Sequence, residues 1–521
     1  MSRKPKPKNQ LSAGQRAALY EKEQNEKLNS IRQGNTQDLM DNDNVSDVNE
    51  IVSADSDAIS RSNQKPKKEK PKPAYATVRV NFSVPVGSIK PMHGMCNGPI
   101  SFEADITSLY KEIGVPYVRF DKTDSCISGQ AIDISRIFKN ADADADDPDS
   151  YDFSRTDSYI AAAYNSGACV IYRLGDSILD GECKLPDDVD KWISVCVHII
   201  RHYNEYWNNG FAYGIRYFEI FNCSDTGVNM YKGDMHELFD FYSKVSKGIH
   251  LYCEDVLLGG MGFSGCDDIT RGFVRYCAKN KLVLDFLSIS SFLKNPEDIT
   301  SDIDKMTVLL YNSGYSTCKI FVNEWGYLHP GEKDIDPRVY IRNSGGLYSM
   351  ECKDIFESQK GIMGAAFDAA FMLKLNSEDS VCAACHYDGQ PSCSRWCDLC
   401  DRYGNRSKTF YAFDAYGQLY RAKNSVMCIS EQQKGMLHSG VYAAAALSDR
   451  NEGYVMLASF DGCNTVDLRL DMIPDNAYTA DIYMIDGVKN LELCDSVALV
   501  GNQKRLLFDM SRYGVTLIKI Y

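Results

Sequence analysis

The chain has 521 residues, of which 44% are hydrophobic and 25% charged, and its formal net charge is −14. This length leaves room for two or three domains, and the composition is that of an ordinary soluble globular protein. The acidic balance argues against broad nucleic-acid binding, and no apolar run reaches the roughly 18 residues that a membrane span requires.

The first part of the chain, residues 1–73, has the composition of a disordered polar tail. It contains no Phe or Trp and a single tyrosine, Tyr20. Such a segment buries too little apolar area to offset the entropy of ordering it. It ends in a linker rich in Lys and Pro, Lys65–Pro73. Because no apolar stretch follows the basic residues after Met1, we expect no secretory signal and a cytoplasmic location. The 19 cysteines are then expected to be mostly free thiols.

Residues 74–424 alternate between short apolar runs and longer amphipathic stretches. The apolar runs predict strands at Thr77–Val84, Val115–Phe120, Cys169–Leu174, Ile215–Phe221, Val256–Gly260, Leu284–Ser290, the run from Ile320, and Val381–Tyr387. The amphipathic stretches predict helices at Pro99–Gly114, Ser154–Ser166, Pro186–Trp207, Met235–Cys253, Ile269–Asn280, Ile299–Ser313 and Gly345–Lys374. Eight strands alternating with helices predict an α/β fold, a (β/α)8 TIM barrel. A doubly wound sheet is the alternative, but no glycine-rich phosphate loop follows the early strands.

The pattern changes in residues 425–521, where strands are joined by short turns. The predicted strands are Val441–Leu447, Gly453–Phe460, Thr465–Leu470, Tyr478–Ile485, Leu491–Leu499, Arg505–Met510 and Val515–Tyr521. Asp461-Gly462 and Asp486-Gly487 supply turn residues between them. These features predict a small C-terminal antiparallel β-sandwich without a catalytic role.

Polar residues follow two of the predicted barrel strands. Asn323-Glu324-Trp325 comes after the apolar run Ile320–Val322, and Asn222-Cys223-Ser224-Asp225 comes after Ile215–Phe221. In (β/α)8 barrels the catalytic groups lie at the carboxyl ends of the strands. A carboxylate in that position, beside a large aromatic residue, is suited to sugar chemistry.

This pattern resembles glycoside hydrolase family 39, the β-xylosidase and α-L-iduronidase relatives within the clan A barrel glycosidases. Those enzymes carry Asn-Glu-Pro after strand four, where the Glu is the acid/base, and a nucleophilic Glu at the end of strand seven. The resemblance implies that Glu324 is the nucleophile, that Asn222 precedes the acid/base position, and that this position holds Cys223. Similar stretches are Met92–Ile100, Val115–Asp121, Leu284–Ser288, His386–Asp388 and Lys408–Phe413. The residues expected to bind the substrate are His93, Asn97, Asp121, Trp325 and Tyr387.

The expected activity is hydrolysis of β-linked sugars such as xylosides, with retention, an altered acid/base, no cofactor and no metal. A thiol with a pKa near 8.5 is a poor proton donor to a glycosidic oxygen. Asp225 and Glu219 are candidate replacements, although Asp225 could equally cap a helix and Glu219 could pair with an arginine. Two alternatives stay open: a catalytically silent barrel that binds glycans or a protein partner, and Cys223 as a nucleophile in its own right, which would need a nearby base.

Two Cys-x-x-Cys pairs, Cys382–Cys385 and Cys397–Cys400, raise the question of zinc. Their separation is shorter than the usual zinc spacing, and the first pair falls on a predicted strand, so buried thiols are the favoured interpretation. The histidines at 198, 202 and 250 are expected to pack within helices. Trp325 and Trp396 are the aromatic residues expected to stack on a sugar, whereas Trp192 and Trp207 are expected to pack against helices.

Overall fold

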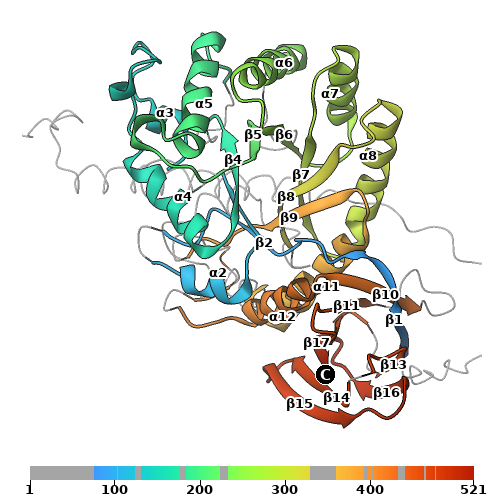
Figure 1. Cartoon of the computed structure of the whole chain (residues 1–521). Helices are drawn as coiled ribbons and strands as arrows, with labels where there is room; N and C mark the ends of the chain where they lie inside the picture. Colours follow the sequence, from blue (N-terminus) through green and yellow to red (C-terminus); the bar gives the residue numbers. More distant parts are fainter. Residues whose placement is uncertain are drawn as a thin grey trace, which may run out of the picture. The chain divides into compact units, whose positions relative to one another are not determined.

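The structure is a computed structural model of the chain (Figure 1). It describes residues 75–101, 104–121, 123, 131–176, 184–222, 231, 233–328, 359–391, 397, 399–401, 404–431, 440–462, 465–475 and 477–521. The predicted tail and linker, residues 1–73, lie outside these ranges. So do Cys223, Asp225, Cys393 and Trp396.

Eight parallel strands close into a barrel in the order in which they follow along the chain. They are β2 (Gly94–Cys96), β3 (Tyr117–Phe120), β4 (Cys169–Leu174), β5 (Tyr217–Ile220), β6 (Leu257–Phe263), β7 (Phe286–Leu293), β8 (Lys319–Tyr327) and β9 (Val381–His386). The barrel closes where β2 pairs with β9. The predicted (β/α)8 fold class is therefore confirmed.

Helices connect these strands. They are α2 (Thr107–Ile113), α3 (Ile134–Ile137), α4 (Ser154–Ser166), α5 (Val189–Asn204), α6 (Met235–Tyr252), α7 (Asp268–Lys279), α8 (Thr300–Asn312), α11 (Ile362–Ser377) and α12 (Lys408–Ala422), with short 3-10 turns at Pro148–Ser150, Trp207–Asn209 and Pro296–Ile299. The five helices α4 to α8 begin within three residues of the predicted starts, whereas α2 begins eight residues after the predicted Pro99 and the predicted start at Gly345 lies outside the described residues. Aspartates cap several amino termini: the Asp188 side chain accepts from Lys191 N at the start of α5, and Asp267 does so from Thr270 N at α7. Asp187 and Asp188, which fall within the helix predicted from Pro186, thus lie just before α5.

The C-terminal part forms a nine-stranded, mostly antiparallel sheet. Its strands are β1 (Tyr75–Ser88), β10 (Asn424–Glu431), β11 (Val441–Leu447), β12 (Gly453–Phe460), β13 (Thr465–Asp471), β14 (Thr479–Ile485), β15 (Asn490–Ala498), β16 (Gln503–Asp509) and β17 (Tyr513–Ile520). They lie in the order β15-β14-β17-β12-β11-β10-β1-β13-β16. Side chains from strands far apart in this order, among them Val78, Leu457, Leu468 and Ile518, share one buried cluster, as in a sandwich.

One strand prediction is wrong. Thr77–Val84, expected as the first barrel strand, belongs to β1, which pairs antiparallel with β10 and parallel with β13 in the C-terminal sheet. The barrel begins instead at β2, whose three residues are too few to show a periodic pattern. The sheet therefore draws one strand from before the barrel, and a boundary at residue 425 does not separate it from the barrel sequence.

Helix α11 lies between the barrel and the C-terminal sheet (Figure 1). It is buried on nearly all sides, which explains why its sequence is apolar throughout rather than amphipathic. Phe367 on α11 packs against Phe460 of β12, and Tyr327 at the end of β8 packs against the same ring. The end of the strand that carries Glu324 is therefore anchored to the sheet. Within the described ranges, no helix is both long enough and apolar enough to cross a membrane.

Candidate active site

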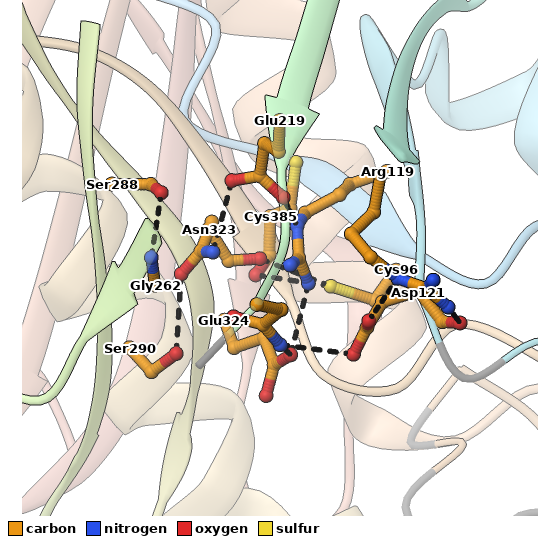
Figure 2. A network of polar contacts seen from close by, with 12 residues as sticks. Cys96, Arg119, Asp121, Glu219, Gly262, Ser288, Ser290, Asn323, Glu324 and Cys385 are labelled. Atoms are coloured by element: carbon orange, nitrogen blue, oxygen red, sulfur yellow. Dashed lines mark hydrogen bonds and ion pairs between the residues drawn. The ribbon is translucent and has the colours of Figure 1, made fainter. Parts of the chain in front are cut away.

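The centre of the barrel holds a buried arginine between two carboxylates (Figure 2). Arg119 on β3 donates from Nε to Glu219 Oε2 at 2.6 Å and from Nη1 to Glu324 Oε1 at 2.9 Å. The exposed fraction of the side chain is 0% for Arg119, 1% for Glu219 and 6% for Glu324. Burial alone would lower the pKa of Arg119, but the surrounding carboxylates outweigh it and raise that pKa. One guanidinium thus pairs with two carboxylates and orients both.

A β-bulge on β8 sets the direction of Glu324. Between the pairs Ile289–Val322 and Ser290–Glu324, β8 has one residue more than β7, and it also has one more than β9. The extra residue is Asn323. A bulge bends its strand and re-aims the neighbouring side chains. Asn323 and Glu324 consequently both reach the inside of the barrel, where their side chains contact Glu219 and Arg119.

Asn323 connects the strand of Glu324 to the rest of the network. Its Nδ2 donates to Glu219 Oε1 at 3.0 Å, and its Oδ1 accepts from Ser290 Oγ at 3.2 Å. Its backbone carbonyl accepts from the thiol of Cys96 at 3.2 Å. Both oxygens of Glu219 are therefore engaged, one by Asn323 and one by Arg119. This confirms the interpretation of Glu219 as a strand acid paired with an arginine.

Asn222 approaches Glu324 from β5. The preceding residue, Phe221, has a left-handed backbone (φ 62°), a conformation that bulky residues rarely adopt and that is often found at functional sites. The Nδ2 atom of Asn222 lies 3.0 Å from Glu324 Oε1 and 3.0 Å from Asp121 Oδ2. Its Oδ1 is buried and has no hydrogen-bond partner among the described residues. Asn222 and Glu324 are therefore in contact, and Asn222 Oδ1 remains as an acceptor atom.

Gly262 on β6 provides the space for this asparagine. A Cβ atom at Gly262 would lie 1.8 Å from Asn222 Oδ1, and the backbone there has φ +70°. Only glycine combines that conformation with so close an approach. Its N–H donates to Ser288 Oγ at 3.1 Å, which ties β6 to β7 (Figure 2).

Asp121 lies at the same end of the barrel, paired with a second buried arginine. Arg173 on β4 donates from Nε to Asp121 Oδ1 at 2.8 Å and from Nη2 to Asp133 Oδ1 at 2.6 Å. Arg173 is fully buried, and the carboxylates of Asp133 and Asp121 raise its pKa against the effect of burial. Asp121 therefore lies beside Asn222 and stands in a buried ion pair with Arg173.

Two more predicted substrate-binding residues lie beside this network. Tyr387, which follows β9, is half-buried; burial raises its pKa, and the neighbouring carboxylates of Asp388 and Glu324 raise it further. Asn97 is buried after β2, and its Oδ1 accepts from the backbone N–H of Asp121 at 3.2 Å. Asn97 thus braces the loop that carries Asp121.

The prediction that Trp325 stacks on a sugar is wrong for this structure. Trp325 is fully buried, and its ring packs against Phe371 of α11, Phe413 of α12 and His386. Successive side chains of a strand point to opposite faces, so the residue after an inward Glu324 points outward to the helices. Trp396, the second proposed stacking residue, lies outside the described residues.

His93 is likewise a packing residue rather than a substrate ligand. It is fully buried, its Nε2 lies 3.1 Å from the carbonyl oxygen of Gly114, and its ring contacts Tyr416 and Tyr420 of α12. It lies one residue before β2 and faces away from the barrel interior. Burial lowers its pKa from 6.5 to about 3.

This burial predicts an acid-sensitive fold. Because the folded pKa of His93 lies below the unfolded one, its contribution to stability is present above about pH 6.5 and is lost as the pH falls. Between pH 7 and pH 5 we expect His93 alone to reduce the free energy of unfolding by about 2 kcal/mol. Urea unfolding of His93→Gln should show that much less pH dependence than wild type. The exposed His236→Gln should behave like wild type; equal slopes for His93→Gln and wild type would contradict the assignment.

Cys385 of the first Cys-x-x-Cys pair lies near Glu219, and neither pair forms a recognisable metal centre among the described residues. Cys385 faces Cys96 in a small cluster inside the barrel, and Cys397 and Cys400 are buried beside each other after β9. Burial raises the pKa of Cys385 to about 12. Among the described residues no group of three or more His, Cys, Asp or Glu side chains is arranged to hold a metal ion.

Several site residues were missed at the sequence level. Arg119 shares a strand face with Asp121, since the two are two positions apart, and that spacing was a usable signal. Arg173, Ser290 and Gly262 carry no local signal, because their roles depend on which strands are neighbours in the barrel.

A closed barrel that gathers buried carboxylates at the carboxyl ends of its strands has the architecture of a barrel glycosidase. Residues 136–309, a segment of the barrel, match the family model Glycosyl hydrolases family 39. The matched segment contains Glu219 and Asn222 and ends before Glu324. The match bears out the glycosidase class predicted from the sequence. No curated protein matches the chain.

Solved structures with the same fold align with this chain over nearly their whole length. A glucosidase from Croceicoccus marinus has a TM-score of 0.69 at 17% identity and covers 86% of this chain and 99% of its own. A monomeric β-xylosidase from Caulobacter crescentus CB15 has a TM-score of 0.61 at 13% identity, covering 85% and 99%. An α-L-arabinofuranosidase from Thermotoga maritima has a TM-score of 0.58 at 12% identity, covering 85% and 99%. At such low identities these likenesses show the fold.

Proposed function

We propose that this protein is a retaining glycoside hydrolase of β-linked sugars such as xylosides, with Glu324 as the nucleophile. The observation that carries this proposal is the setting of Glu324. Its carboxylate stands at the end of β8, where Arg119 and Asn222 each donate to Oε1 at about 3 Å. The nearby orphan acceptor on Asn222 suits a substrate hydroxyl, which would donate to it.

The reaction would proceed in two displacements. In the first, a Glu324 oxygen forms a bond to the anomeric carbon while the glycosidic bond breaks, and the bonding electrons leave with the aglycone oxygen. Arg119 and Asn222 hold the carboxylate in position, so little orientational freedom is lost at that moment. In the second, water attacks the anomeric carbon as the bond to Glu324 breaks, the proton of that water passes to bulk solvent, and the sugar is released with its original configuration.

The proton for the leaving group is the altered part of this mechanism. The chain has Cys223 directly after Asn222. Glu219 is not suited to replace an acid, because both its oxygens accept hydrogen bonds and it is 1% exposed. Asp121 is paired with Arg173, which favours its ionised form. We therefore propose that the enzyme prefers leaving groups that need little protonation.

A test compares leaving groups on wild type, Cys223→Glu and Cys223→Gln, the last being a matched variant without an ionisable group. The substrates are β-xylosides, β-glucosides and α-L-arabinofuranosides with dinitrophenyl or alkyl leaving groups. Wild type should hydrolyse a dinitrophenyl glycoside far better than its alkyl counterpart. Cys223→Glu should raise kcat/KM for the alkyl glycoside by about 10²-fold or more, because a general acid typically contributes about 10²–10⁴-fold. It should leave kcat/KM for the dinitrophenyl glycoside nearly unchanged, because kcat/KM reports the first displacement and this leaving group hardly needs a proton.

Two outcomes would count against this account. An equal gain in Cys223→Gln would show that the effect is one of shape and not of acid catalysis. Absence of turnover in every variant would overturn the proposed activity. That result would favour the alternative function, a barrel that binds glycans or a protein partner, which the replacement of the acid position by Cys223 already supports.

The close approach at Gly262 yields a second prediction. Gly262→Ala should displace the Asn222 side chain and lower kcat/KM for the dinitrophenyl glycosides by about 10²-fold, the effect of misplacing a positioning group by about 1 Å. Gly214→Ala is the matched control, because Gly214 has a similar φ of +65° and no atom within 4 Å of the added Cβ. Equal losses of activity in both variants would contradict the role assigned to Gly262.

A further inference from the structure

We infer that Glu219 is a positioning residue that sets the basicity of Glu324 through Arg119. This inference rests on the proposed function, in which Glu324 is the nucleophile. One guanidinium is shared between two carboxylates: Arg119 donates from Nε to Glu219 and from Nη1 to Glu324. Arg119 Nη2 is buried and has no hydrogen-bond partner among the described residues.

Glu219 is fixed more firmly than a simple ion pair would require. Asn323 Nδ2 holds its second oxygen at 3.0 Å, and Ser290 Oγ in turn holds Asn323 at 3.2 Å. Asn323 is also the residue directly before Glu324 on the bulged strand. Arg119, Glu219 and Asn323 therefore form a closed set of contacts that returns to Glu324 through its own backbone (Figure 2).

The electrostatic consequence follows from the charges. A nucleophilic carboxylate facing a whole guanidinium charge would be strongly stabilised and correspondingly less basic. A second buried carboxylate on the same guanidinium draws off part of that charge and repels the first. Glu219 therefore keeps Glu324 more basic than Arg119 alone would allow, while Arg119 still orients it.

The other charged or titratable groups around the pair come from different strands. Arg119 on β3, Cys96 on β2, and Cys385 and Tyr387 on and after β9 interact electrostatically with Glu324 or Glu219. Asp121 and Asp388 interact in turn with members of this group. Glu219 is distinguished from these because it shares a hydrogen-bonded guanidinium with Glu324.

The test is the pKa of the Glu324 carboxyl, measured by carbon-13 NMR on protein labelled at glutamate. The Glu324 resonance is assigned by its loss in Glu324→Gln. In Glu219→Gln the pKa of Glu324 should fall by about one unit, because a like charge is removed and Arg119 is left to Glu324 alone. Asp467→Asn is the matched control: Asp467 is a buried carboxylate paired with Arg469 and Arg505 in the C-terminal sheet, and its replacement should leave Glu324 unchanged.

Activity provides a second readout. The acidic limb of the pH profile of kcat/KM for a dinitrophenyl glycoside should move to lower pH by the same amount in Glu219→Gln, and kcat should fall about 10-fold as the nucleophile becomes less basic. If Glu219→Gln does not fold, Glu219→Asp provides the test. The shorter aspartate side chain places its carboxylate farther from Arg119 and Glu324, so the pKa of Glu324 should fall by a smaller amount than in Glu219→Gln.

An unchanged pKa of Glu324 in folded Glu219→Gln, or in Glu219→Asp where Gln does not fold, would overturn this inference and leave Glu219 a structural residue. The NMR titration needs no turnover, so an inactive wild type would count against the proposed hydrolase and not against this coupling.

Discussion

Replacing Glu324 with alanine will lower kcat/KM for the dinitrophenyl glycosides by about 10⁴-fold or more, measured by release of the phenolate. The expected loss is this large because the variant removes the group that forms the covalent bond, and a lost nucleophile is not replaced by its neighbours. The chosen leaving group hardly needs an acid, so the loss reports on the nucleophile alone. Glu431→Ala, an exposed glutamate on β10, should retain wild-type activity.

Added azide sharpens this prediction. In Glu324→Ala a small anion can enter the space of the missing carboxylate, attack the anomeric carbon and expel the phenolate. We expect azide to restore phenolate release and to give a glycosyl azide with inverted configuration at the anomeric carbon. Restored hydrolysis without a glycosyl azide, or full activity of Glu324→Ala without azide, would show that Glu324 is not the nucleophile.

Replacing Arg119 with methionine should lower the free energy of unfolding by about 3–5 kcal/mol at neutral pH, as measured by denaturant titration. Removing one member of a buried ion pair leaves uncompensated buried charge, and here two carboxylates, Glu219 and Glu324, lose their shared cation. The triple variant that also carries Glu219→Gln and Glu324→Gln should regain most of this loss, since no buried charge is then left unpaired.

The control for this prediction is an arginine–glutamate pair at the surface. Arg79 and Glu431 are both exposed, so Arg79→Met should change the free energy of unfolding by less than about 1 kcal/mol. Equal losses in Arg119→Met and Arg79→Met would mean that the central pair is not the buried network described above.

Much of the fold could be predicted from local patterns. The helix Ser154–Ser166 and the strands Cys169–Leu174, Val441–Leu447 and Gly453–Phe460 have the bounds expected from hydrophobic periodicity. The errors concern pairing over long distances. Nothing in residues 77–84 indicates that their partners lie near residues 424–431 and 465–471. The hydrophobic periodicity of a segment indicates that it is a strand, but it does not indicate which strand it pairs with.

In the site, too, residues with a local sequence pattern could be predicted, and features that depend on strand pairing could not. Glu324, Asn222 and Asp121 could be found because they follow apolar runs that end at one edge of a parallel barrel. Trp325 was misplaced although strand alternation argued against it, and His93 because its position before β2 was not recognisable. The bulge at Asn323, which turns two consecutive side chains inward, depends on the registers with β7 and β9 and leaves no local sequence pattern.

The most direct test of the central claim is to trap the covalent intermediate. A dinitrophenyl 2-deoxy-2-fluoroglycoside of the sugar that wild type hydrolyses fastest would be incubated with the protein and the adduct located by peptide mass spectrometry. The fluorine slows both displacements, and the reactive leaving group keeps the first one fast enough for the intermediate to accumulate. We expect one sugar per chain, attached to Glu324 and absent in Glu324→Gln. A label on another residue, or a protein that hydrolyses the parent glycoside without ever becoming labelled, would contradict it.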